Sequence, residues 1–300
     1  MPSIIDQIRT LRQQRNAIIL AHNYVLPEVQ DIADMCGDSL ELSRRASETN
    51  ADVIVFCGVR FMAETASILS PDKKVLLPVL DAGCPMADMV TPEQLKQKMQ
   101  MLPNIPVVTY VNSNADVKAL STVCCTSANV VDIVNQMESD EILMVPDKNL
   151  ARYAARFTQK KIHLWDGYCP IHHQLTSDQV IQAKKAYPKA EFIAHPECSS
   201  DVLDMADAIL STSGMIAHTT RSSHYEFIIA TEMGMLYPLQ KANPQKQFYS
   251  ASPSLICPDM KKIHLADILN CLSLLSNEIK VPEEIRVLAY NSVERMIRMK

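Results

Sequence analysis

The dipeptide Cys-Pro occurs three times in this 300-residue chain, at Cys84, Cys169 and Cys257, with intervals of 85 and 88 residues. Such even spacing of a rare dipeptide indicates an internal threefold repeat. Cys169 has no second cysteine close enough for a C-x-x-C pair, so its metal-binding partners must come from distant parts of the chain. Three thiolates from three repeats can bind zinc, completed by histidine or water, or an iron–sulfur cluster that leaves one iron without a protein ligand. His172 and His173 are the candidates for a fourth ligand.

The repeat extends to the sequence around each cysteine. A helical pattern begins seven residues after each cysteine, at Thr91, Thr176 and His264. Upstream, the apolar runs "AIILAHNY", "PVVTYVNS" and "EFIAHPEC" indicate buried parallel strands that end in polar residues. The equivalent polar positions at these strand ends are His22, Tyr110 and His195. Seventeen residues further on, where a strand end gives way to a helix start, stand Ser39, Ser127 and Thr212.

Each repeat predicts the series helix, strand, loop, helix, strand, loop, helix, strand, with Cys-Pro just past the last strand. The predicted fold class is α/β, with three homologous three-layer αβα sandwich domains that have parallel sheets. We expect these domains at residues 1–87, 88–172 and 173–258, each contributing one cysteine, and C-terminal helices at 259–300 that pack back on the repeats. Ligands of such sheets bind beyond the carboxyl ends of the strands. A pseudo-threefold arrangement would therefore bring the polar positions and the three cysteines to a central active-site cavity.

Composition narrows the class of partner. The net charge is −5, from 29 basic and 34 acidic residues, and there is no Lys/Arg run, which argues against nucleic acid or an anionic membrane as the main partner. The segment "MPSIIDQIRTLRQQRN" has an amphipathic helix pattern with both charge signs, and nowhere do 18 apolar residues follow one another. We therefore expect a cytoplasmic protein whose partners are small molecules and whose nine cysteines stay reduced.

The ordered motifs along essentially the whole chain resemble those of a known family, the bacterial and archaeal quinolinate synthases (the A protein of NAD biosynthesis). The motifs are "AHNYVLPEVQDIAD" (21–34), "GDSLEL" (37–42), "GVRFMAE" (58–64), "CPMAD" (84–88), "YVNS" (110–113), "TSAN" (126–129), "PDKNLA" (146–151), "GYCPIH" (167–172), "HPEC" (195–198), "STSGM" (211–215), "TEMGM" (231–235) and "CPDMKK" (257–262). Asp88, Tyr168 and His173 depart from the family pattern, and none of them is one of the three cysteine ligand positions.

The resemblance implies a triangular three-domain fold with a four-iron, four-sulfur (4Fe-4S) cluster on three cysteines, which map onto Cys84, Cys169 and Cys257. The fourth iron would be open to substrate and would act as a Lewis acid in dehydration. The implied reaction condenses iminosuccinate (iminoaspartate) with dihydroxyacetone phosphate to give quinolinate, phosphate and two waters. We expect an L-aspartate oxidase or dehydrogenase to supply the iminosuccinate.

These substrates carry carboxylates and a phosphate, so their cavity needs hydrogen-bond donors. Hydroxyl and backbone N–H groups at Ser39, Ser127 and Thr212 can bind such anions near helix starts. The alternative is that each of these residues is only an N-cap. Lys148 and Arg60 could neutralise phosphate, or could be solvated surface residues.

Ring closure and aromatisation also move several protons. Glu197 is the first candidate for general base and acid, followed by His22, His195 and Tyr24, and the resemblance implies that all four lie in the active site. It also implies substrate contacts by Tyr110 and Asn112, and a contact by His172, which follows Cys169 closely.

Two other functions use the same three cysteines. A zinc-dependent lyase or hydrolase would be colourless and tolerant of oxygen, whereas a cluster enzyme would be brown and inactivated in air. An iron–sulfur sensor would need a basic DNA-reading element or a large apolar patch, and the sequence shows neither. The remaining cysteines are assigned to packing, with Cys198 as a substitute ligand if the repeat alignment is wrong: Cys36, Cys57, Cys124, Cys125, Cys198 and Cys271.

Overall fold

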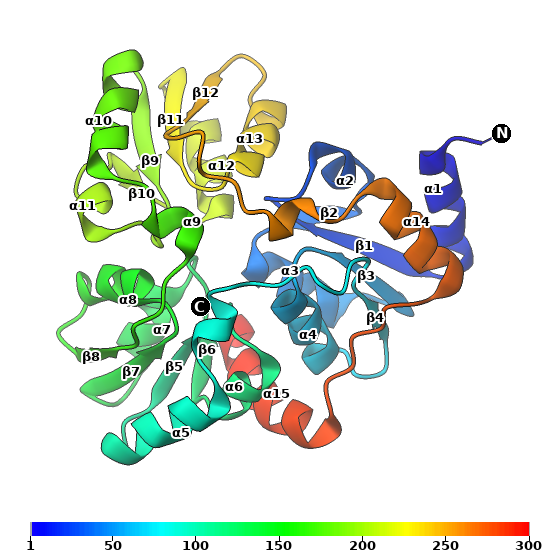
Figure 1. Cartoon of the computed structure of the whole chain (residues 1–300), viewed down its shortest axis with the longest axis horizontal. Coiled ribbons are helices and arrows are strands. Elements are labelled where there is room, and N and C mark those ends of the chain that lie inside the picture. Colours follow the sequence, from blue (N-terminus) through cyan, green and yellow to red (C-terminus); the bar gives the residue numbers. More distant parts are fainter. Residues whose placement is uncertain (1, 300) are drawn as a thin grey trace.

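Three parallel four-stranded sheets form the frame of the protein, which is described over residues 2–299 by a computed structural model (Figure 1). The sheet orders are β2-β1-β3-β4, β6-β5-β7-β8 and β10-β9-β11-β12. The strands are β1 (Ala17–His22), β2 (Met35–Gly37), β3 (Val53–Cys57), β4 (Lys74–Leu76), β5 (Val107–Tyr110), β6 (Val123–Cys125), β7 (Glu141–Val145), β8 (Lys161–Leu164), β9 (Glu191–Ala194), β10 (Ala208–Ile209), β11 (Glu226–Ala230) and β12 (Gln247–Ser250). Figure 1 shows the sheet of β1–β4 at the right and the other two at the left.

Helices alternate with the strands, which confirms the α/β class. They are α1 (Ile4–Gln14), α2 (Pro27–Ile32), α3 (Ser39–Glu48), α4 (Arg60–Leu69), α5 (Pro92–Met101), α6 (Ala115–Ala119), α7 (Val130–Gln136), α8 (Lys148–Ala155), α9 (Pro170–His173), α10 (Ser177–Ala186), α11 (Ser200–Leu203), α12 (Thr212–Arg221), α13 (Leu236–Ala242), α14 (Leu265–Leu274) and α15 (Glu283–Arg298), with short 3₁₀ turns at Ala87–Met89, Met233–Met235 and Asp259–Lys261. Thr91, Thr176 and His264 are the N-caps of α5, α10 and α14, so the predicted helix starts after each Cys-Pro are confirmed.

Each sheet has one strand more than the predicted series. The strand ends expected just before Ser39, Ser127 and Thr212 are those of β2, β6 and β10, which contain only two or three residues and were not counted in that series. These short strands lie at one edge of each sheet, beside the central strands β1, β5 and β9.

The three units repeat one another in hydrogen bonding as well as in strand order. In each, the backbone N–H of a residue near the start of the first strand donates to a side chain 15 residues further along the chain. These pairs are Ile19 with Asp34, Val107 with Thr122, and Phe192 with Asp207, at 2.8, 3.1 and 2.8 Å. Counting three residues on from each donor gives His22, Tyr110 and His195, so the structure assigns these three residues equivalent positions.

The C-terminal segment joins units that are distant in sequence. Helix α14 packs on α1, and α15 packs on α4, α6 and β6. On α15, Ser292 Oγ donates to Lys118 O at 2.8 Å, and the carbonyl of Met296 accepts from Asn129 at 3.1 Å. The predicted division at residues 87, 172 and 258 stays a prediction.

Burial follows the strand pattern. The central strands carry continuous apolar residues, and β3 is buried along its whole length, as expected for parallel strands covered on both faces. Among residues 2–299, no helix combines the length and hydropathy that a membrane-spanning segment needs.

Candidate active site

Polar side chains stand just beyond the carboxyl ends of the three central strands. His22 and Tyr110 end β1 and β5, and His195 follows β9. Two residues further on in each unit come Tyr24, Asn112 and Glu197. The chain therefore delivers two side chains from each unit to equivalent places.

The three cysteines of the Cys-Pro dipeptides line one cavity of about 100 Å³. They are half-buried, and Tyr24, Asn112, His172 and Glu197 lie in the same lining. The cysteines come from loops 85 and 88 residues apart in sequence. Their convergence is therefore a property of the tertiary structure.

A second cavity of about 50 Å³ shares Tyr24, Asn112 and Glu197 with the first. Its other polar lining residues include His22, Ser39, Tyr110, Ser127, His195 and Thr212. Together the two cavities contain the three Cys-Pro cysteines and all ten residues that were predicted to act in catalysis or to contact substrate, although the roles stay predictions. His173, the other candidate for a fourth ligand, lines neither cavity and lies 3.1 Å from the Asn149 amide instead. Lys148 and Arg60 are not brought to either lining, because they pair with Asp166 at 2.8 Å and Glu64 at 3.2 Å.

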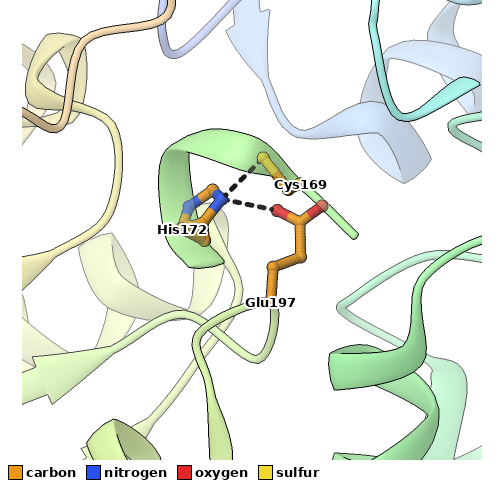
Figure 2. A group of neighbouring side chains, drawn as sticks. All are labelled: Cys169, His172 and Glu197. Carbon is orange, nitrogen blue, oxygen red and sulfur yellow. Dashed lines mark hydrogen bonds and ion pairs between the residues drawn. The ribbon is translucent and has the colours of Figure 1, made fainter. Parts of the chain in front are cut away.

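Glu197 contacts one histidine from the lining of each cavity. Its Oε2 lies 3.1 Å from His172 Nδ1 and 3.1 Å from His195 Nδ1. His172 Nδ1 also lies 3.1 Å from Cys169 Sγ. Figure 2 shows Cys169, the residue just before α9, and His172 on α9 facing Glu197, which lies on the loop after β9. Donor atoms of these three residues all lie within 4.8 Å of one another, so the group could hold a metal ion.

Burial sets the protonation states in this region. It lowers the pKa of His22 to about 3 and that of His172 to about 4, so both imidazoles are neutral at pH 7. It also raises the pKa of the Tyr24 phenol well above its ordinary value. For Glu197, burial disfavours the charged form, but His172, His195 and Tyr110 outweigh it and hold its pKa below the ordinary value. Glu197 is therefore a carboxylate that the surrounding side chains stabilise in its charged form.

The hydroxyl groups near the helix starts are not N-caps. Asp38 and Ser211 cap α3 and α12 with their own side chains. Ser39 and Thr212 are the first residues of those helices, and Ser127 lies three residues before α7. The capping alternative is thus wrong for all three, and their hydroxyls can contact a ligand. The linings of both cavities contain no Lys or Arg among the described residues, so anions there would depend on neutral donors and helix N-termini.

The donor set of the first cavity fits a thiolate-bound metal centre. Burial raises the pKa of Cys84 to about 12 and raises the pKa values of Cys169 and Cys257 too. Buried thiols of this kind become thiolates when a cation is bound beside them. Glu197 Oε1 and Asn112 Oδ1 are also buried without a hydrogen-bond partner within residues 2–299, as expected in a cavity that receives a polar group. Cys198 lies in the apolar core instead, at 0 % exposure.

Two residues near the site were not predicted from the sequence. Thr231 Oγ1 lies 2.5 Å from the Tyr24 hydroxyl and 2.8 Å from His172 Nε2, and so links the two side chains. Asn23 donates to Thr212 Oγ1 at 3.0 Å across two units. The only sequence signal for Thr231 was its place in "TEMGM", after a strand end.

Comparison with known proteins gives one consistent family. The family model described as "Quinolinate synthetase A protein" matches residues 6–298. The quinolinate synthase of Geotalea uraniireducens is 55% identical over 98% of this chain and 97% of its own length. The quinolinate synthase of Thermodesulfovibrio yellowstonii is 53% identical over 98% of each chain, and quinolinate synthase 1 of Methanosarcina acetivorans is 52% identical over 99% of this chain and 98% of its own.

Proposed function

The chain belongs to the quinolinate synthetase A family of enzymes, and from this premise we propose that it makes quinolinate from iminosuccinate and dihydroxyacetone phosphate. The reaction balances with the release of one phosphate and two waters. It would act in de novo NAD biosynthesis in the cytoplasm, with iminosuccinate supplied by an L-aspartate oxidase or dehydrogenase.

Cys84, Cys169 and Cys257 would hold a 4Fe-4S cluster in a pseudo-threefold arrangement of the units around the central cavity. Such a cluster supplies Lewis acidity at the iron that has no protein ligand. Support comes from the three thiols that line a single cavity, since each unit offers one.

Substrate anions would be bound by the second cavity. Ser39 and Thr212 offer hydroxyls at the N-termini of α3 and α12, where helix dipoles and free N–H groups favour negative charge. Ser127 Oγ lies 3.2 Å from His195 Nε2, so the two side chains would act on the same substrate group. Tyr110, Asn112 and His172 would complete the contacts.

Glu197 would take up and return the protons. Its pKa is held low enough for it to be a base at neutral pH, and it faces both cavities. His22 fits a donor role because its Nδ1 accepts from Tyr24 N–H at 3.2 Å, which leaves the proton on Nε2. Tyr24 and His195 would hold the substrate against Glu197 and exchange protons with it.

The observation that carries this proposal is the shared wall of Tyr24, Asn112 and Glu197 between the cysteine-lined cavity and the donor-lined cavity. Anaerobic iron and sulfide analysis, combined with a quinolinate assay, tests it. Cys84→Ala, Cys169→Ala and Cys257→Ala should each lose both cluster and activity. Cys271→Ala should retain both, because Cys271 is buried in the core and donates to Ser276 O. The opposite pattern would remove the ligand assignment.

A zinc lyase or hydrolase is the second candidate, because the Cys169–His172–Glu197 group resembles a mixed zinc site. In that case Cys169→Ala would remove one equivalent of zinc, and the protein as purified without air would lack sulfide. Iron and sulfide in equal amounts would exclude this function.

A further inference from the structure

Two buried carboxylates occupy the same place in the second and third units. Asp147 is the second residue after β7, and Glu232 is the second residue after β11. Both belong to motifs, "PDKNLA" and "TEMGM", that the proposed chemistry leaves without a role. Asp147 is 2 % exposed and Glu232 is 1 % exposed. A buried carboxylate is costly unless several donors meet it.

Each carboxylate uses its two oxygens in the same way. One oxygen accepts from the start of the following helix: Asp147 Oδ1 from Asn149 N–H at 2.7 Å, and Glu232 Oε2 from Gly234 N–H at 2.7 Å. The other oxygen accepts from a cysteine backbone: Asp147 Oδ2 from the Cys169 N–H at 3.3 Å, and Glu232 Oε1 from the Cys257 N–H at 3.1 Å. The carboxylate therefore fixes the cysteine loop to the helix beside it.

The first unit differs at this position and obtains a carboxylate from elsewhere. The second residue after β3 is Val59, which has no acceptor. Asp259 Oδ1, two residues after Cys257, accepts from Gly83 N–H at 3.1 Å instead. Lys262 Nζ bridges the same two loops, lying 2.8 Å from Asp259 Oδ1 and donating to Asp81 O at 2.6 Å. Every cysteine loop is thus attached to one carboxylate.

We propose that Asp147, Glu232 and Asp259 are positioning residues that hold the three cysteine loops, and that Asp147 and Glu232 also withhold the cysteine N–H groups from the cluster. This inference rests on the proposed cluster. Hydrogen bonds to cluster sulfurs, net charge and burial set the reduction potential of an iron–sulfur centre. Two cysteine N–H groups that donate to carboxyl oxygens are not free to donate to cluster sulfurs, and this favours the oxidised cluster. A centre that resists reduction suits a reaction with no redox step.

Glu232→Gln is the sharpest test. Glu232 accepts from two backbone N–H groups and from Lys261, at 2.9 Å to Oε1 and 3.0 Å to Oε2. A glutamine has one acceptor oxygen, so its NH₂ group must face a donor. Glu64→Gln is the matched control, because Glu64 is also buried, accepts Ala115 N–H at 2.9 Å and pairs with Arg60, but touches no cysteine loop.

In Glu232→Gln, the ratio of reduced to oxidised cluster at a fixed potential should rise about tenfold, which is 59 mV for a one-electron couple. Iron release to a ferrous chelator should also accelerate several-fold, whereas Glu64→Gln should match the wild type in both. The measurements are a spectroelectrochemical titration and the chelation rate, with circular dichroism as the check on folding. If Glu232→Gln does not fold, two other variants provide the test. Asp147→Asn should raise the reduction potential of the cluster, and the charge-conserving Glu232→Asp should keep the wild-type potential.

A potential and a chelation rate unchanged in both Glu232→Gln and Asp147→Asn would overturn the inference. A folded variant that binds no cluster would support the positioning role. Absence of iron and sulfide from the wild type would instead overturn the proposed cofactor, so the two failures are distinguishable.

Discussion

Replacing Thr231 by valine removes one hydroxyl and keeps the shape of the side chain. That hydroxyl is the bridge between the Tyr24 phenol and His172 Nε2, at 2.5 and 2.8 Å, and Thr231 is only 1 % exposed. Tyr24 and His172 would both lose their positioning contact.

The expected cost follows from the two lost hydrogen bonds. A buried polar group left unpaired costs about 1–3 kcal/mol, so two groups give roughly 2–6 kcal/mol in total. We expect this to be divided between the free energy of unfolding and the activation barrier. About 1–2 kcal/mol on the barrier corresponds to a kcat/KM about 5- to 30-fold lower.

The assay is anaerobic quinolinate formation at matched iron and sulfide content, together with denaturant unfolding. Thr109→Val is the control, because Thr109 is also fully buried and bonds to Ser121 at 2.5 Å, but lines neither cavity. It should lose stability and keep kcat/KM. Tyr24→Phe combined with Thr231→Val should cost less than the sum of the two, because both act through one contact. A Thr231→Val enzyme with full cluster and wild-type kcat/KM would refute the positioning role.

Two further predictions concern the contacts between units, and the first is about Lys118, whose Nζ donates to Phe61 O at 3.3 Å and to Thr65 Oγ1 at 2.9 Å in the first unit. Burial lowers the pKa of Lys118 from 10.5 to about 8 in the folded protein. Between pH 8 and pH 10.5 the unfolded chain therefore binds more protons than the folded protein does. The free energy of unfolding then rises with pH across this range, by up to about 3 kcal/mol. Lys118→Met should abolish that rise in denaturant unfolding between pH 7 and 10, and a parallel rise in both proteins would contradict the assignment. Gly234→Ala should weaken the contact between the first and third units, because a Cβ would lie 2.5 Å from Tyr24 O and 2.7 Å from Lys261 Nζ. Faster iron loss than in wild type is the expected result, and an unchanged rate would show that the loop adapts.

Local patterns were sufficient to predict the strand ends and the helix starts. The apolar runs before His22, Tyr110 and His195 are the central strands of the three sheets, because a strand buried on both faces leaves a continuous apolar signature. Thr91 and Thr176 could be predicted because a capping box is encoded within four residues. The threefold repeat allowed the three units to be aligned, so that a strand end or helix start found in one unit could be predicted in the other two.

Contacts over long sequence separations could not be predicted in this way. Thr231 meets Tyr24 across 207 positions and His172 across 59. Asp259 reaches Gly83 across 176. A hydroxyl or carboxylate beside a strand end has many possible partners, and only tertiary packing selects one. The position of His172 after Cys169 marked it as a candidate ligand, and the resemblance to a family added its predicted contact with substrate.

The repeat also explains why the site needs units that have diverged. Equivalent positions carry Tyr24, Asn112 and Glu197, so the wall between the two cavities holds a single carboxylate. Three glutamates there would repel one another, and all but one would be driven to the neutral form. With one carboxylate, the imidazoles His172 and His195 can both lie 3.1 Å from the same oxygen. The repeated backbone thus brings three side chains to one place, and their different chemistry leaves one carboxylate, Glu197, in the wall that the two cavities share.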